Sequence, residues 1–437
     1  MKVTIVSSSC PGDTPSLSPE LLAATLARYS RNNTGIHKLI ESLDLSSEAG
    51  SASAVDRIFK FTDYGHASIG DMTGALTLAF DGVTMVGAYF LFAAAPYGAG
   101  QESSTRYIKM DESSLPSQAE CGLSDLLFDD AQGVWKRGLE LYQIAYEKLD
   151  AIARETPEKT RIPTNMPEKV RDRMLKNFAL DRARNFLPFA LKTNVAVMQS
   201  ARAWCETSSK LRSYGAPELL HMAIEIEQAL ARMAPRLAKH AKFKRGCSEH
   251  WHKGVPKVAG RVSPNQRAFA TVLSLEQLTG DGMELRENRY DECPPDIQDA
   301  VVGLHIPSLA IAELRDLNRH RTGSKRVDLR QARGLELCEE ITELMPKEAG
   351  AFVQEAARIL RKHEFRTELP WLMPLGTTVP FSHTMAAAKF AYEAELRTGP
   401  GAHFRYAQHL RAAVASLYET PHSGFARRIN LGQAEPE

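Results

Sequence analysis

Gln101-Glu102-Ser103-Ser104-Thr105-Arg106-Tyr107 and Arg319-His320-Arg321 are the two stretches on which the interpretation of this chain depends. The first places a hydroxyl and a guanidinium on one short loop. This pairing suits a phosphate, because arginine donates to two oxygens and serine supplies another donor. Gly98 and Gly100, just before it, allow a ligand to approach the backbone closely. The same residues are also typical of a surface loop with a local salt bridge.

The Arg-His-Arg stretch lies inside a basic segment, residues 315–330, in which Asp316 and Asp328 do not neutralise the cations. Such a cluster can hold a diphosphate or stabilise an anionic ring. Two other interpretations stay open: a solvated basic helix end, which the helix dipole favours, and an RNA-binding patch. The segment lacks the interleaved aromatic residues on which bases stack, so we expect no nucleic-acid partner.

Composition is that of an ordinary globular protein. With 437 residues, 43% of them hydrophobic and 24% charged, the chain is long enough for two domains. The net charge of +1 gives no overall basic field, and the six cysteines form no Cys-x-x-Cys pair, which favours a reducing cytoplasm. No apolar run reaches the roughly 18 residues of a membrane span, so we expect no membrane partner. Cys247, His250 and His252 lack the spacing of a structural zinc site, and we expect no metal.

Hydrophobic periodicity predicts a first strand at Met1–Val6, and mixed strand and helix signals over 76–80 and 84–92. A polar stretch without periodicity, rich in Lys, Gly and His, predicts a linker at 246–260. We therefore predict a first domain at 1–245, with a helical insertion at about 111–165, and a shorter second domain at 261–437. The spacing predicts helices over 123–153, 168–185, 195–206, 217–240, 307–318, 335–362, 379–396 and 402–418.

An internal repeat is visible near the end of each half. In the first half, Leu187-Pro188 precedes a predicted helix that ends in Leu211-Arg212. In the second half, Met373-Pro374 precedes a predicted helix that ends in Leu396-Arg397. Each Leu-Arg pair is followed by a Gly-containing loop and another helix. The repeat predicts a tandem duplication, although simple helix capping explains the two arginines equally well.

Together these motifs resemble the flavin-dependent thymidylate synthase family, in which R-H-R is followed directly by N-E-x-S-x-R-Y. The resemblance implies an α+β fold with two copies of a domain built from a twisted sheet flanked by helices. Each half has lost a different part of the signature. Ala94-Ala95-Pro96 stands at the R-H-R place of the first copy, whereas the second copy has only Ser324-Lys325-Arg326 and has Pro370 in place of an arginine. The losses are complementary, which favours a site that still works.

The resemblance also assigns roles to single residues. Ser30 and His66 match elements near the flavin, although a lone histidine is more often structural. Arg212 matches the arginine that contacts and polarises the uracil ring, which makes it the catalytic candidate. The cofactor-binding candidates are Ser30, His66, Arg319, His320 and Arg321. The substrate-binding candidates are Glu102, Ser104, Arg106, Arg184 and Arg397.

The chemistry implied by the family is one-carbon transfer to a uracil or related pyrimidine nucleotide, or its reduction. FAD is the implied cofactor, with NADPH and methylenetetrahydrofolate as co-substrates, and the flavin carries the hydride chemistry. Family sites form where subunits meet in a tetramer, so a duplicated chain is expected to form a homodimer that resembles that tetramer. A non-catalytic relative that binds a nucleotide or flavin and has a regulatory or structural role is the alternative.

Overall fold

The computed structural model describes residues 1–6, 16–29, 36–45, 47–62, 67–95, 98–105, 110–160, 162–163, 165–245, 267–274, 276–332, 334–399 and 402–432. Contacts divide the chain into two compact units. The first unit comprises Met1–Ser104, Pro116–Leu123 and Lys192–Lys253, and the second comprises Thr105–Leu115, Ser124–Leu191 and Gly254–Glu437. No helix in the described part of the chain combines the length and apolar character that a membrane span requires.

These units differ from the sequential boundaries expected at 245 and 261. Residues 124–191 belong to the expected first domain, where they comprise most of the expected insertion and the stretch after it, but they pack with the second unit. The expected linker at 246–260 lies outside the described residues. The boundaries drawn from the sequence describe a predicted repeat, whereas the units describe packing, so each unit is treated by itself below.

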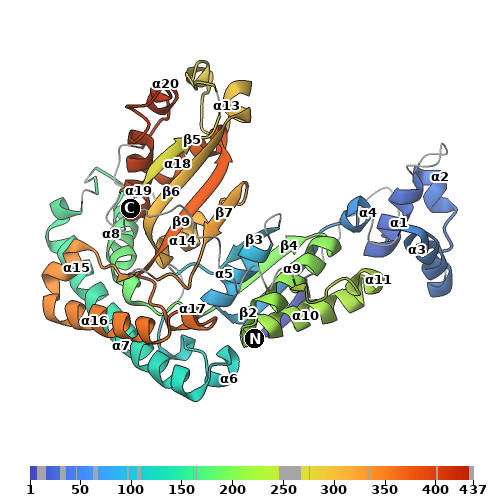
Figure 1. Cartoon of the computed structure of the whole chain (residues 1–437), viewed down its shortest axis with the longest axis horizontal. Helices are drawn as coiled ribbons and strands as arrows, with labels where there is room; N and C mark the ends of the chain where they lie inside the picture. The colour runs from blue at the N-terminus through green and yellow to red at the C-terminus, as the bar shows by residue number, and fades with distance from the viewer. Residues whose placement is uncertain are drawn as a thin grey trace. The chain divides into compact units, whose positions relative to one another are not determined.

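The first unit contains a four-stranded antiparallel sheet in the order β1-β2-β4-β3 (Figure 1). Its strands are β1 (Lys2–Val6), β2 (Leu76–Thr84), β3 (Ala99–Glu102) and β4 (Lys192–Gln199). The helices of this unit are α1 (Pro19–Tyr29), α2 (Ile36–Glu41), α3 (Glu48–Thr62), α4 (Ala67–Asp71), α5 (Met85–Ala94), α6 (Gln118–Cys121), α9 (Ala201–Tyr214), α10 (Pro217–Met233) and α11 (Pro235–Ala238).

The second unit repeats this strand order in a second antiparallel sheet, β5-β6-β9-β7, with β8 also paired to β9. Its strands are β5 (Phe269–Val272), β6 (Val301–Ala310), β7 (Ser324–Val327), β8 (Gly334–Leu335) and β9 (Thr377–Ala386). Its helices are α7 (Asp125–Glu155), α8 (Glu168–Ala183), α13 (Pro295–Asp299), α14 (Ile311–Leu317), α15 (Glu339–Leu344), α16 (Pro346–Lys362), α17 (Leu369–Leu372), α18 (Ala387–Arg397), α19 (Phe404–Ala415) and α20 (Ser423–Arg427). Short 3-10 turns lie at Glu112–Ser114, Pro157–Lys159, Arg184–Phe186 and Met283–Leu285.

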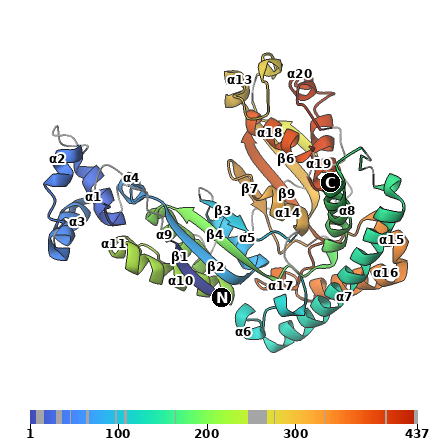
Figure 2. The same cartoon turned by 180° about the vertical axis from the view of Figure 1, so that it is seen from behind.

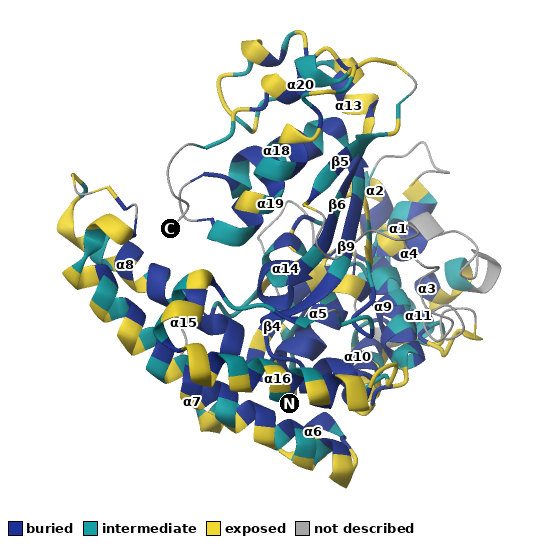
Figure 3. Ribbon diagram, turned by 60° about the vertical axis from the view of Figure 1, so that its left-hand side comes forward, coloured by how far each residue is buried: buried dark blue, intermediate teal, exposed yellow. Residues whose placement is uncertain are grey.

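Four long strands each run directly into a helix: β2 into α5, β4 into α9, β6 into α14 and β9 into α18. The predicted helices at 195–206, 307–318 and 379–396 were therefore wrong over their first part, which is strand. Physically, a strand buried on both faces has no polar alternation, and β6 and β9 are mostly buried (Figure 3). Without a glycine or proline at the join, such a strand and the next helix form one continuous apolar segment. The predicted first strand is confirmed, as is the α+β fold class.

In the second unit, the two segments that the repeat equates pair with each other. Pro188 and Pro374 form an isolated antiparallel bridge. The Phe189 amide donates to the Met373 carbonyl at 2.8 Å, and the Leu375 amide donates to the Leu187 carbonyl at 2.7 Å. Because each half-motif gives the other the same bond that it receives, the contact has local two-fold symmetry.

The helix α7 supports this junction. A Cβ on Gly138 would lie 2.4 Å from the Phe186 carbonyl oxygen, so only glycine permits α7 to approach the turn that carries Arg184. The indole of Trp135 donates to the Trp371 carbonyl at 2.9 Å, which ties α7 to α17. In both views of the ribbon, α7 lies beside α16 (Figure 2). The turn that carries Arg184 is thus fixed by close packing.

Candidate functional site

The carboxylate of Asp316, in the last turn of α14, is the centre of a charged cluster in the second unit. An Nη2 donor of Arg184 lies 3.3 Å from the Asp316 carboxylate, and Nη1 of Arg184 lies 3.4 Å from Asp181. Burial by itself raises the pKa of the Asp316 carboxyl. The charges of Arg184, Arg319 and Arg397 outweigh burial, so this pKa lies well below its usual range. Asp316 therefore stays ionised and gathers arginines from three segments of the unit.

Arg397, the last residue of α18, is held by three groups without a net charge. Its Nε donates to Nε2 of His320 at 2.7 Å, its Nη2 donates to the Asp316 carbonyl at 3.1 Å, and its Nη1 donates to the Tyr406 hydroxyl at 3.4 Å. An arginine has five N–H donors, and these bonds use three of them. The other two have no partner among the described residues. The guanidinium is thus oriented, yet its charge is not neutralised by a directly bonded carboxylate.

His320 is a buried, neutral part of this cluster. Its side chain is only 4% exposed. Burial lowers the pKa of His320 to about 3, because the effects of Arg397 and nearby lysines add to burial and only Glu393 opposes it. Since Arg397 donates to Nε2, the proton of the neutral ring lies on Nδ1. His320 is therefore committed to protein partners.

Several cations near His320 are partly desolvated. Burial lowers the pKa of Lys325 to about 8, and burial also lowers the pKa of Arg321 and of Lys389. The one carboxylate that acts on both lysines is Glu393, whose residue is fully buried. Two lysines against this one carboxylate leave an excess of positive charge among the described residues, in a place that water reaches poorly. Such an arrangement attracts an anion.

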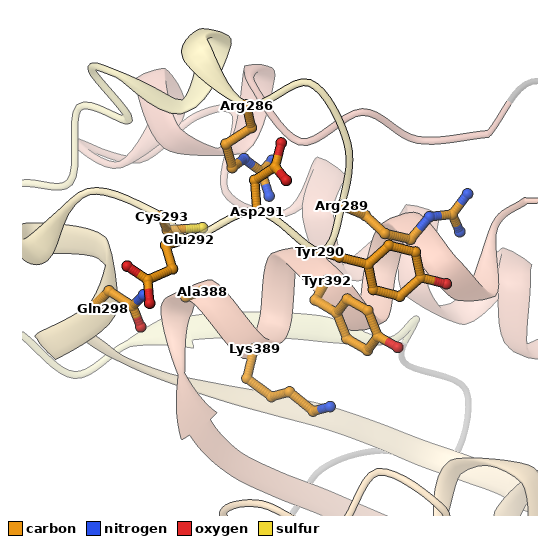
Figure 4. Close-up of a pocket in the computed structure, with 10 residues that line it drawn as sticks. All are labelled: Arg286, Arg289, Tyr290, Asp291, Glu292, Cys293, Gln298, Ala388, Lys389 and Tyr392. Carbon is orange, nitrogen blue, oxygen red and sulfur yellow. The ribbon is translucent and has the colours of Figure 1, made fainter.

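A cavity of about 330 Å³ borders this cluster in the same unit (Figure 4). Tyr392 joins the two features: its ring lines the cavity and makes an edge contact with His320, with centroids 6.2 Å apart. The Lys389 ammonium lies 4.4 Å from the centre of the Tyr392 ring, and the Tyr290 ring lies 5.8 Å away. The cavity is lined by Arg286, Arg289, Tyr290, Asp291, Glu292, Cys293, Gln298, Ala388, Lys389 and Tyr392. The lining thus combines two aromatic rings with cations and with the acids Asp291 and Glu292, which suits an aromatic ligand that carries polar groups.

Comparison of the sequence with known proteins identifies its family. Residues 15–236 match the family described as thymidylate synthase complementing protein, and this span is half of the chain. The chain belongs to this family. A UPF0159 protein of Chlamydia pneumoniae is 23% identical over 471 aligned residues, which cover 89% of this chain and 85% of that relative. The crystal structure of a UMP/dUMP methylase, PolB, from Streptomyces cacaoi, bound with 5-Br dUMP, is 17% identical, has a TM-score of 0.31, and matches 55% of this chain and 93% of that chain.

The thymidylate synthase complementing protein match includes the candidates of the first copy, whereas the Arg-His-Arg stretch and Arg397 lie beyond it. Among those inside, Glu102 ends β3 opposite Val195 on β4, and Ser104 follows two residues later. Three more candidates, Ser30, His66 and Arg106, lie outside the described residues. Their roles stay predictions.

Arg212 is bound to an acidic side chain. Its Nε lies 3.0 Å from Glu227 on α10, and its Nη2 lies 2.6 and 2.5 Å from the two oxygens of the same carboxylate. Ser208, one turn earlier on α9, also donates to Glu227 at 2.9 Å. The catalytic role of Arg212 stays a prediction, and it would require this bidentate ion pair to open.

The structure thus groups Arg184, Arg319, His320, Arg321 and Arg397 in the second unit, and it places Glu102, Ser104 and Arg212 in the first. Sequence reasoning missed Glu393, His383 and Tyr406, and it counted Asp316 only as a charge. One signal was available: Glu393 precedes Arg397 by four residues, one helical turn. For His383, a strand residue far from the motifs, we find no sequence signal.

Proposed function

We propose that this chain binds a pyrimidine nucleotide, or a related nucleotide-like substrate, and transfers a one-carbon unit to it or reduces it with a flavin. Membership of the thymidylate synthase complementing protein family supports this proposal at the level of the reaction class. The observation that carries it is the guanidinium of Arg397, held by three uncharged groups with two donors left over. A planar carbonyl edge or a phosphate of a nucleotide is the natural acceptor for such a fork.

The residues present fit FAD in part. Arg319 is exposed and Arg321 is partly buried with a lowered pKa, so both suit a diphosphate or an anionic ring. His320 does not suit a direct contact, because Arg397 already uses its Nε2. When bound, a flavin would supply hydride transfer, with NADPH as reductant and methylenetetrahydrofolate as carbon donor. The role of this chain would be to bind and orient the flavin and the nucleotide, and to stabilise the negative charge that develops during the reaction.

A second candidate function is non-catalytic binding of a nucleotide or flavin in a regulatory or structural role. One observation favours it: Glu227 neutralises Arg212, the residue expected to polarise the uracil ring. The two candidates differ in turnover, since both predict binding.

The two repeated sheets and the reciprocal Pro188–Pro374 contact support our inference that the chain arose by tandem duplication. On that basis we propose that it forms a homodimer, and the lack of a Cys-x-x-Cys pair in the sequence supports a cytoplasmic location. Light scattering of the purified chain tests the homodimer, and a monomer at micromolar concentration would contradict it.

Visible absorption of the purified protein, before and after titration with FAD, is the first test. Flavin bands that appear with saturable affinity would support the flavoenzyme proposal. A chain that ignores FAD but binds dUMP in calorimetry would favour the non-catalytic candidate, and one that binds neither would exclude both. Turnover is then followed as NADPH oxidation that depends on dUMP and methylenetetrahydrofolate.

A further inference from the structure

Glu393 of α18 is a buried carboxylate whose pKa is lowered against burial by His320, His383 and Lys325. It is fully buried, and neither of its oxygens has a hydrogen-bond partner within the described part of the chain. Two imidazole nitrogens lie within ion-pairing distance of it: Nδ1 of His383 at 3.5 Å and Nδ1 of His320 at 3.7 Å. An isolated buried carboxylate is strongly destabilising, so a group that is kept there calls for a reason.

The proton positions suggest that reason. Arg397 donates to Nε2 of His320, which places the ring proton on Nδ1, the atom that faces Glu393. His383 is fixed from its other side, where Nε2 lies 2.8 Å from the Thr322 carbonyl. The negative charge of Glu393 favours the ring form of His320 that has Nδ1–H and a bare Nε2. Only that form can accept from Arg397.

The first unit shows what happens without this arrangement. Ser208 stands one turn before Arg212, as Glu393 stands one turn before Arg397. There the acid, Glu227, comes from the next helix and binds the arginine directly. In the second unit Glu393 acts through an imidazole, so the arginine is oriented without a bonded carboxylate, and two of its donors have no partner among the described residues.

We propose that Glu393 is a positioning residue that sets the tautomer of His320 and thereby holds Arg397 toward the ligand. The ligand in this inference, a pyrimidine nucleotide, rests on the proposed function. The part that concerns the His320 tautomer does not depend on it. The distances, the complete burial of Glu393 and the direction of the Arg397 bond carry it.

The experiment uses the full chain with 15N-labelled histidine, and His320→Asn assigns the resonance of that ring. In the unchanged protein, the His320 signals are those of the Nδ1–H tautomer. In Glu393→Leu, which has similar volume and no charge, we expect a mixture of tautomers and a dUMP dissociation constant raised about tenfold, the loss of one oriented charged hydrogen bond. Glu393→Gln keeps the shape and removes the charge, and we expect a smaller change in the same direction. This variant serves as the test if the leucine variant does not fold.

The matched control is Glu313→Gln. Glu313 is a fully buried acid of the same unit that pairs with Arg405 and His409, and it makes no contact with His320 or Arg397 among the described residues. This variant should leave the His320 tautomer unchanged. Combining Glu393→Leu with His320→Asn should weaken dUMP binding no further than the histidine change alone, because the two residues act in series.

An Nε2–H tautomer in the unchanged protein, or an unchanged tautomer in both Glu393 variants, would overturn the proposal. If the unchanged chain binds no dUMP, the proposed function fails, and the tautomer result still decides whether Glu393 orients His320. Additive losses in the double variant would also refute a series arrangement.

Discussion

Arg212 and Arg397 lie in the last turns of α9 and α18, which follow matching strands of two sheets with the same strand order, yet their surroundings are opposite. Glu227 neutralises Arg212 by a bidentate ion pair, whereas Arg397 is held by an imidazole, a carbonyl and a hydroxyl. The difference teaches that a repeated sequence motif fixes the place of a side chain but not its electrostatic state. Of the two arginines, Arg397 is the one prepared to meet an anion.

A second contrast concerns the start of the helix after the second strand. In the first unit, Glu218 of α10 accepts from the Thr84 amide at 2.8 Å and from its hydroxyl at 2.7 Å. A Cβ on Gly87 would lie 3.0 Å from that carboxylate. In the second unit the acid, Glu313, lies on the helix itself and Arg405 of α19 reaches it at 3.2 Å. The same join is thus closed by two different polar contacts.

The largest effect is expected for Arg405→Ala. Among the described residues, it leaves the buried Glu313 with His409 as its remaining ion-pair partner, and breaking a buried pair destabilises by about 3–5 kcal/mol. Glu218→Gln in the first unit keeps one acceptor and should cost about 1–2 kcal/mol. Hydrogen exchange of the amides of α14 and α5 follows each unit separately. Equal losses in the two units would contradict the contrast.

The next effect is on binding. Arg397→Ala should weaken dUMP affinity about 100-fold, the loss of a charged two-donor contact. Arg212→Ala is the matched change and should weaken it less than about threefold, because its charge is already neutralised. Calorimetry with dUMP measures both. A larger effect at Arg212 would show that its ion pair with Glu227 opens and would restore it as the catalytic candidate.

Flavin content gives the third test. Arg319→Ala combined with Arg321→Ala removes two cations from the expected flavin site and should reduce FAD affinity at least tenfold, since a diphosphate would lose its partners. Visible absorption after gel filtration with FAD gives the readout. The control is Arg137→Ala, an exposed arginine of α7 paired with Glu140, which should retain the flavin. Intact flavin in the double variant would mean that the basic segment serves another ligand.

The last effect is on the pH dependence of stability. Burial, followed by the charge of Arg184, lowers the pKa of His403 to about 4. An unfolded histidine has a pKa near 6.5, so below about pH 6.5 the unfolded state binds more protons and stability falls until about pH 4. His403→Asn keeps a cap for α19 and should flatten this decline, whereas exposed His221→Asn should not. Urea unfolding at pH 7, 6, 5 and 4 measures the slopes, and parallel curves would refute the assignment.

The sequence supported the family, the α+β class and the location of the basic cluster, because these depend on local motifs. It failed where strands enter helices without a turn, as at β9 and α18, because an apolar run does not reveal its own period when both faces are buried. It also missed the contacts that Glu393 makes with His320 and His383, since these groups meet only when separate segments of the chain pack together. Charge counting noted Asp316 but could not place it between Arg184 and Arg397.

One feature of the second unit bears on how the protein is made. Trp135 donates to the carbonyl of residue 371, and the amide of Phe189 donates to the carbonyl of Met373. A ribosome releases the chain from the amino end, so these partners of 124–191 are synthesised long after it emerges. The packing of α7 against α17 therefore cannot form until residues 369–375 have been synthesised, late in the production of the chain.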